Sequence, residues 1–117
     1  MDKVRKKDNK EARIQADVEK RLLLEKWYVK NTHGNIYQAG FPDLYVAHIK
    51  YGTRWIEVKN PDGWAFTPAQ VIEFPLMAAS GVGIWIVTDP YQVPDILFTP
   101  PNFWQFFGAF QAKTRRA

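Results

Sequence analysis

A helical pattern of apolar positions comes first along the chain. Within residues 9–25, charged side chains separate apolar residues that recur every four positions at Ile14, Val18 and Leu22. This spacing predicts an amphipathic helix with one face turned toward a core. Asn9 is a suitable N-cap, and Glu11 falls in the first turn, where the helix dipole favours an acidic side chain.

The middle of the chain carries the pattern of a β-hairpin. Apolar and aromatic residues fill Leu44–Ile49 and Trp55–Lys59, and only a short connection around Tyr51–Gly52 separates them. Two such runs joined by a short turn predict antiparallel strands. A further short strand is predicted at Trp27–Val29, followed by a turn at Thr32–Asn35.

A helix and a fully buried strand are predicted next. Thr67 is a good N-cap and precedes a proline, so we expect a helix that extends to Ala79 and ends at Gly81. Pro75 removes a backbone hydrogen bond inside this helix, so a kink is expected there. The unbroken apolar run Val82–Val87 is typical of a strand buried on both faces, parallel to the strand before the helix and reached by a right-handed crossover.

Aromatic residues crowd the last part of the chain, about residues 100–117. After several prolines, a final helix is predicted at Phe103–Lys113. Its aromatic side chains are Phe103, Trp104, Phe106, Phe107 and Phe110. Three interpretations stay open for this segment: packing in the core, a homodimer surface, or stacking against nucleic-acid bases.

Length and composition fit a single domain over residues 1–117. Hydrophobic residues make up 46% of the chain, which is enough for a core. The absence of cysteine excludes disulfides, thiolate metal sites and cysteine nucleophiles. The sequence has neither an apolar run of membrane-spanning length nor the pattern of a signal peptide, so we expect a soluble cytoplasmic protein.

The net charge of +4 is concentrated at the two ends of the sequence. The basic residues there are Lys3, Arg5, Lys6, Lys7 and Lys10 at one end, and Lys113, Arg115 and Arg116 at the other. One interpretation is two solvated ends. The other is a pair of basic arms, the first at about residues 1–8, that contact the phosphates of a nucleic acid.

The predicted hairpin brings acidic and basic side chains together. Asp43 opens the first strand, directly after a proline, and Glu57 and Lys59 lie near the end of the second. Residues two apart on a strand share a face, so Glu57 and Lys59 project together. In an antiparallel hairpin the start of the first strand lies beside the end of the second, which places Asp43 near both.

This cluster suits a divalent metal and hydrolysis of a phosphodiester. Two carboxylates about 4 Å apart repel by about 4 kcal/mol at an effective dielectric constant of about 20, and a cation turns them into ligands. Mg²⁺ prefers such oxygen ligands, and a metal-bound water is acidic enough to attack phosphorus. Lys59 would orient that water or neutralise charge in the transition state. A lone Glu-x-Lys is more often a solvated face, but the added Pro-Asp and capped helix make the pattern more specific.

Three blocks of this pattern resemble one known family. Gly40-Phe41-Pro42-Asp43-Leu44, Trp55-Ile56-Glu57-Val58-Lys59 and Thr67-Pro68-Ala69-Gln70 occur in the order and with the gaps of the virus-type replication-repair nuclease family, VRR-NUC, of the PD-(D/E)XK superfamily. The resemblance covers roughly Glu11 to Val87. It implies an α/β, restriction-endonuclease-like fold with a small mixed β-sheet flanked by helices.

The resemblance also implies roles for individual residues. Asp43 and Glu57 would bind Mg²⁺, for which Mn²⁺ would substitute, and the Val58 carbonyl would be a third ligand. Lys59 would be the catalytic lysine. Gln70 matches the glutamine that borders the active site in this family; otherwise it would be an exposed helix residue.

An acidic residue on the first helix completes the family pattern. The family has a glutamate there, commonly followed four residues later by glutamine, and Glu11 with Gln15 fits this spacing. Glu11 is therefore expected to be a catalytic and metal-binding residue. Glu19 is the competing choice.

The implied activity is a DNA nuclease that acts in repair or recombination. Stand-alone members of the family resemble Holliday junction resolvases, so branched DNA and a homodimer are expected, in a phage or prophage setting. The alternatives are a flap- or end-processing nuclease, a catalytically inactive DNA-binding module of the same fold, and a structural interaction protein built around the aromatic segment.

Other residues are expected to be structural or peripheral. His33 and His48 are not spaced like a metal-binding pair, which favours a structural or surface role. Trp64 and Phe66 follow the acidic strand and either pack against the fold or form a wall beside the DNA.

Overall fold

The computed structural model describes residues 9–32 and 40–108. Several predicted features lie outside these residues: the basic arm at residues 1–8, His33 and most of the turn that contains it, Phe110, and the basic residues from Lys113 onward. Asn9 already lies within the first helix, so it is not the N-cap that the sequence predicts.

Within the described residues, four strands form one mixed sheet in sequence order. The elements are α1 (Asn9–Leu24), β1 (Tyr28–Asn31), β2 (Leu44–His48), β3 (Gly52–Val58), α2 (Pro68–Ala79), β4 (Ile84–Val87) and the short 3₁₀ helices η2 (Pro90–Gln92) and η3 (Asp95–Phe98). The sheet order is β1-β2-β3-β4, with β1 and β2 antiparallel, β2 and β3 antiparallel, and β3 and β4 parallel. The predicted α/β class, the hairpin and the parallel final strand are confirmed.

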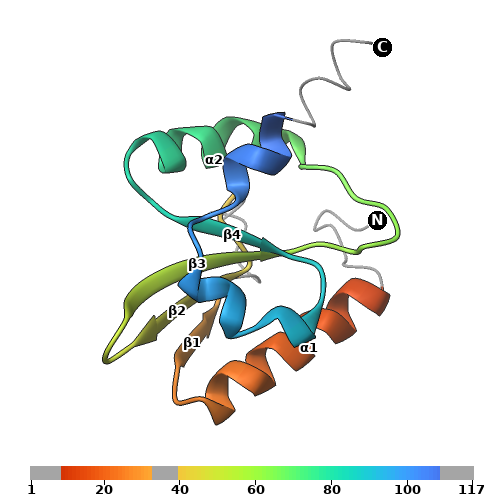
Figure 1. Cartoon of the computed structure of the whole chain (residues 1–117). Coiled ribbons are helices and arrows are strands. Elements are labelled where there is room, and N and C mark those ends of the chain that lie inside the picture. The colour runs from red at the N-terminus through yellow and green to blue at the C-terminus, as the bar shows by residue number, and fades with distance from the viewer. Residues whose placement is uncertain (1–8, 33–39, 109–117) are drawn as a thin grey trace.

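Helices cover both faces of the sheet (Figure 1). On one face, α1 buries Ile14, Val18 and Leu22 against strand residues that include Val46 and Ile56. On the other face, α2 and the helical residues 103–108 pack over β4, where the buried side chains are Phe66, Phe74, Ile84, Ile86, Phe103 and Phe107. Strand side chains alternate between these layers, so Ile56 and Val58 face α1, whereas Glu57 shares the α2 face.

The ends of α2 follow the chemistry predicted for them. Thr67 caps the helix: its hydroxyl accepts from the Gln70 backbone, and the Gln70 side chain accepts from the Thr67 backbone. After Ala79 the chain turns at Gly81, which has a φ of +94°, a conformation that favours glycine. Pro75 lies inside the helix, which continues past it. A kink at that point stays a prediction.

The open edge of β4 is closed by a side chain. The Asn102 amide accepts from the Ile86 backbone nitrogen at 2.6 Å and donates to the Ile86 carbonyl at 3.1 Å. One asparagine thus replaces one residue of a neighbouring strand and covers an edge that would otherwise be available for pairing with another chain.

Some boundaries differ from the sequence prediction. β1 begins at Tyr28 because Trp27 is turned into the core, with its backbone nitrogen bonded to Leu22 at the end of α1. β4 begins at Ile84, two residues later than predicted, because the Val82 nitrogen is still bonded to the Met77 carbonyl of α2. Among the described residues, no helix combines the length and apolar character that crossing a membrane requires.

The aromatic segment divides between core and surface. Phe103 and Phe107 are buried against Phe66, as the core interpretation predicts. Phe106 is half-buried, and the Trp104 side chain is 53% exposed. Trp104 is the most exposed aromatic side chain among the described residues of this helix, and the dimer and base-stacking interpretations stay predictions.

Candidate active site

Asp43 and Glu57 hold each other through the backbones of neighbouring strands. Leu44 pairs with Ile56 in the hairpin, so the residue before β2 lies beside Glu57. The Asp43 nitrogen donates to Glu57 Oε1 at 3.1 Å, and the Val58 nitrogen donates to Asp43 Oδ2 at 2.7 Å. The two carboxylates are 1% and 2% exposed. The antiparallel hairpin therefore brings Asp43 and Glu57 together, as the alternation of strand side chains and the direction of the two strands predict.

Lys59 extends into the same buried space. It follows β3 directly, and its backbone nitrogen donates to the Val87 carbonyl, which continues the pairing with β4. Its ammonium lies 3.2 Å from Glu57 Oε2 and is itself only 2% exposed. Burial of a charged side chain to this extent is costly unless the charge is paired. The ion pair with Glu57 supplies that partner.

Gln70 joins the acid to the lysine. Its Nε2 donates to Glu57 Oε2 at 2.8 Å, and its Oε1 accepts from Lys59 Nζ at 2.8 Å and from the Thr67 nitrogen at 3.1 Å. Gln70 is 6% exposed and is the third residue of α2. The capping box of α2 and the polar cluster on β3 are therefore one hydrogen-bonded unit. The alternative of an exposed helix residue is excluded by this burial.

Residues of the loop between β3 and α2 surround the lysine head group. Lys59 Nζ donates to the Ala65 carbonyl at 3.1 Å. The centroids of the Trp64 and Phe66 rings lie 5.6 Å and 5.5 Å from the same nitrogen, within the range of cation–π attraction. The role of the Ala65 carbonyl was not predictable from the sequence, because every residue type carries the same backbone acceptor. Packing and a position beside the site turn out to be compatible for Trp64 and Phe66.

The first helix presents its two candidate acids differently. Glu11 is 4% exposed, in the first turn of α1. The neighbouring Lys10 forms an ion pair with Asp62 at 2.6 Å, which places this turn beside the loop that follows Lys59. Glu19 is half-buried and accepts from the Asn31 side chain at 3.3 Å, toward β1. The greater burial and this position favour Glu11, whose role stays a prediction.

Gln15 lies between Glu11 and Glu19 along α1, and its side-chain oxygen lacks a hydrogen-bond partner among the described residues. Its Nε2 donates to Glu19 Oε2 at 3.3 Å, but its buried Oε1 has no hydrogen-bond partner among the described residues. A buried carbonyl oxygen of this kind is normally satisfied by a water molecule or an ion. An acceptor thus remains on the helix face that carries Glu11.

The donor set fits Mg²⁺ as a two-carboxylate site. No group of three or more His, Cys, Asp or Glu side chains in the described part of the chain is arranged to hold a metal ion. Mg²⁺ needs only one or two carboxylates, since it keeps several waters. Asp43 and Glu57 are hard oxygen donors, and Lys59 supplies a single positive charge against their two negative ones.

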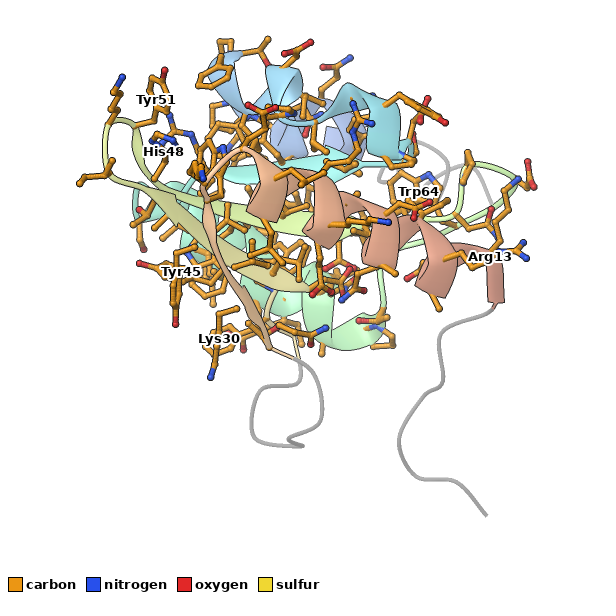
Figure 2. The ribbon with its side chains drawn as sticks, turned by 90° about the horizontal axis from the view of Figure 1, so that it is seen from below. Arg13, Lys30, Tyr45, His48, Tyr51 and Trp64 are labelled. Carbon is orange, nitrogen blue, oxygen red and sulfur yellow. The ribbon has the colours of Figure 1, made fainter. Side chains whose placement is uncertain are left out.

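His48 takes no part in this cluster. The His48 ring packs against that of Tyr51 in a tilted arrangement, with centroids 4.6 Å apart, and its Nδ1 accepts from the Lys50 nitrogen. Figure 2 shows His48 and Tyr51 at one end of the molecule, with Trp64 at the other. The geometry of His48 fits the structural role predicted for it.

The fold, together with the acidic residues at the ends of β2 and β3, identifies a class of fold. A mixed four-stranded sheet between helices, with an aspartate just before one strand and a glutamate and a lysine at the end of its neighbour, is the arrangement of a PD-(D/E)XK-like fold. A solved structure described as "VRR_NUC domain" is similar to the chain, with a TM-score of 0.60 and 24% sequence identity, over 77% of this chain and 96% of that one. This likeness confirms the fold that the sequence pattern implied. No family model matches the sequence. No curated protein matches it either.

Proposed function

We propose that the chain is a metal-dependent endodeoxyribonuclease that hydrolyses phosphodiester bonds and prefers branched DNA, as a Holliday junction resolvase does. The observation that carries the proposal is the buried contact of Asp43, Glu57 and Lys59 on a fold shared with a VRR_NUC domain. Carboxylates that repel each other in a buried place are hard to explain by stability alone. A divalent cation would offset this repulsion and use both carboxylates as ligands.

Each residue of the cluster has a task in this chemistry. Asp43 and Glu57 would hold Mg²⁺ or Mn²⁺, with the Val58 carbonyl and Glu11 as further ligands. The bound cation supplies a Lewis acid and lowers the pKa of a coordinated water. The Lys59 ammonium donates a hydrogen bond to the phosphoryl group, where negative charge increases in the transition state.

Gln70 acts on the other members of the site. Its amide holds Glu57 Oε2 and Lys59 Nζ at 2.8 Å each, so it fixes the spacing between the acid and the ammonium. Displacement of either group by about 1 Å would cost a large part of the rate. Gln70 is therefore a positioning residue in this proposal.

DNA as the partner agrees with the distribution of charge. Seven of the 16 basic residues lie in residues 1–8 and 109–117, against two of the 12 acidic ones, Asp2 and Asp8. The positive charge of the protein is thus carried by the ends of the sequence. Contacts from these ends to phosphates would make DNA affinity fall steeply with salt.

Paired cuts across a junction require two sites. A homodimer with twofold symmetry would place one site on each of two opposing strands, because a symmetric dimer repeats the same surface on both copies. This activity belongs in DNA repair or recombination, in the cytoplasm of a bacterial host of a phage or prophage.

A cleavage assay tests the proposal directly. The substrates are a four-way junction, a flap, a nicked duplex and a plain duplex, each with Mg²⁺, Mn²⁺ or a chelator. We expect paired symmetric cuts in the junction, with either metal, that the chelator abolishes. Asp43→Ala and Glu57→Ala should abolish cleavage while DNA binding persists.

The other outcomes assign other functions. Cutting of flaps or free ends alone would retain the nuclease and exclude the resolvase. Binding of DNA with no cutting of any substrate would identify an inactive DNA-binding module. No affinity for DNA would leave a structural interaction protein.

A further inference from the structure

Three oxygen atoms surround the Lys59 ammonium, two as hydrogen-bond acceptors and one as an ion-pair partner. Two of these oxygens belong to the polar cluster itself, Glu57 Oε2 at 3.2 Å and Gln70 Oε1 at 2.8 Å. The third is the carbonyl of Ala65, at 3.1 Å, in the loop between β3 and α2. An ammonium has three donors and no more. Any oxygen of a substrate that binds Lys59 must therefore replace one of these oxygens.

Access to the cluster is closed as well. Asp43, Glu57, Lys59 and Gln70 are between 1% and 6% exposed. Trp64 lies over the ammonium of Lys59 and is half-buried, with its ring also against Phe106. A phosphate group in a DNA strand cannot contact Lys59 in this state, because the side chain is only 2% exposed.

The segment Pro61–Ala65, here called the cover, contacts the rest of the fold through Asp62, the Ala65 carbonyl and the half-buried Trp64 ring. Asp62 is bonded to Lys10 of α1, but the two side chains are 70% and 44% exposed, so solvent screens the pair. Gly63 has open space around it. The segment ends at Phe66, which is 5% exposed and packs in the aromatic core on the α2 face. Movement up to Ala65 therefore takes the Trp64 ring away from the edge of this core and leaves its buried members in place.

We propose that DNA displaces the cover from Lys59, and that an oxygen of the phosphate to be cut takes the place of the Ala65 carbonyl on the third N–H. Trp64 leaves the ammonium in the same movement and becomes a DNA-contacting residue. This inference rests on the proposed function, since it assigns Lys59 to the phosphate. The Glu57 and Gln70 contacts stay in place, because they belong to the cluster that positions the lysine.

A reversible cross-link tests the movement. The chain has no cysteine, so a Lys10→Cys/Asp62→Cys protein carries only the two introduced thiols. A bifunctional methanethiosulfonate joins them across the position of the ion pair, and a reductant releases them. With Asp62 tied to α1 and Phe66 buried, we expect cleavage of a four-way junction to fall on the order of 100-fold, the usual effect of losing one transition-state donor. The reductant should restore it, and the reagent should not affect either single-cysteine variant.

A second measurement needs no cleavage. Protein labelled with 5-fluorotryptophan has five ¹⁹F resonances, and Trp64→Phe identifies that of Trp64. Addition of junction DNA in chelator should shift the Trp64 resonance and leave that of Trp85, which is held by Thr99 within the other layer, unchanged. The cross-linked protein should show no Trp64 shift.

The outcomes separate the two proposals. If reduced and cross-linked proteins cut DNA equally fast, the cover proposal is wrong and the nuclease stands. If no form of the protein cuts any substrate, the nuclease proposal is wrong, and the fluorine spectra still decide the cover. A Trp64 resonance that DNA leaves unshifted, at concentrations where binding is saturated, overturns it.

Discussion

Gln70 donates a 2.8 Å hydrogen bond to Glu57 across the boundary between a helix and a strand. The two residues are 13 apart in sequence, and the loop that connects them wraps around Lys59. Gln70 also completes the capping box of α2. The start of this helix and the geometry of the polar cluster thus depend on the same side chain.

Replacement of Gln70 should therefore lower the free energy of unfolding by more than replacement of an ordinary capping residue does. Gln92 is a matched control, since it completes the capping box of η2 with Asp89 but contacts no buried charge. We expect Gln92→Ala to lower the free energy of unfolding by about 1 kcal/mol, as for other caps. Gln70→Ala should lower it by about 3 kcal/mol, since Glu57 and Lys59 each lose a buried partner. Urea denaturation measures both; equal losses would show that Gln70 acts only as a cap.

Metal binding should appear as stabilisation that depends on Asp43. A ligand at a concentration of about 100 times its dissociation constant stabilises the folded state by about 2.7 kcal/mol. Thermal unfolding with and without Mg²⁺ should show this gain for the wild type. Asp43→Asn should abolish it, although its amide oxygen still accepts from the Val58 nitrogen.

The control for this experiment is Asp62→Asn, which removes an exposed carboxylate on the nearby loop. It should respond to Mg²⁺ as the wild type does, because an exposed ion pair contributes little and Asp62 lies outside the cluster. A full response from Asp43→Asn would exclude this residue as a metal ligand.

The polar cluster was predictable from the sequence because it depends on strand geometry. Side-chain parity puts Glu57 and Lys59 on one face, and the hairpin direction brings in Asp43. Both rules need only the positions of two short strands. The structure has the expected hairpin, with Leu44 opposite Ile56. Gln70 needed a further step, the resemblance to a family, because its burial depends on how α2 docks.

Other contacts of the site and the fold carry no sequence signal. The Ala65 carbonyl that binds Lys59 is a backbone group and is common to every residue type. Asn102 closes the edge of β4 with its side chain, yet an asparagine after two prolines is typical of any turn. The choice between Glu11 and Glu19 also depends on packing, since both lie on the same side of the same helix. Such features follow from docking in three dimensions.

Replacement of Lys59 should lower both the free energy of unfolding and the rate of DNA cleavage, but only the first should be restored by metal. Lys59→Met leaves two buried carboxylates without their cation, so we expect the free energy of unfolding without metal to fall by about 3 kcal/mol. Mg²⁺ should then stabilise this variant more than it stabilises the wild type, because the metal replaces the missing positive charge. DNA cleavage should stay on the order of 100- to 1,000-fold below wild type even with saturating metal.

Lys50→Met provides the matched substitution on the exposed turn of the hairpin. Its cleavage rate and its response to Mg²⁺ should equal those of the wild type. If Lys59→Met cut DNA at the wild-type rate, Lys59 would be a structural counter-ion and not a catalytic residue. Thermal unfolding and the junction assay together distinguish these cases.

Asn102 should be a determinant of solubility as well as stability. Its side chain satisfies both backbone groups of Ile86, a residue that is 1% exposed. Asn102→Leu should lower the free energy of unfolding by about 2 kcal/mol, since a buried donor and an acceptor lose their partners. Asn102→Asp keeps the acceptor for the Ile86 nitrogen and should lose less.

The exposed β4 edge in Asn102→Leu is then available to pair with a second chain, because unpaired strand edges template association. Light scattering during mild heating should rise for this variant before it rises for the wild type. Gln105→Leu adds the same side chain at an exposed position in helical residues 103–108. It controls for the added hydrophobicity alone. Equal aggregation of the two variants would mean that the added leucine, and not the uncovered edge, drives association; aggregation confined to Asn102→Leu would assign edge protection to this asparagine.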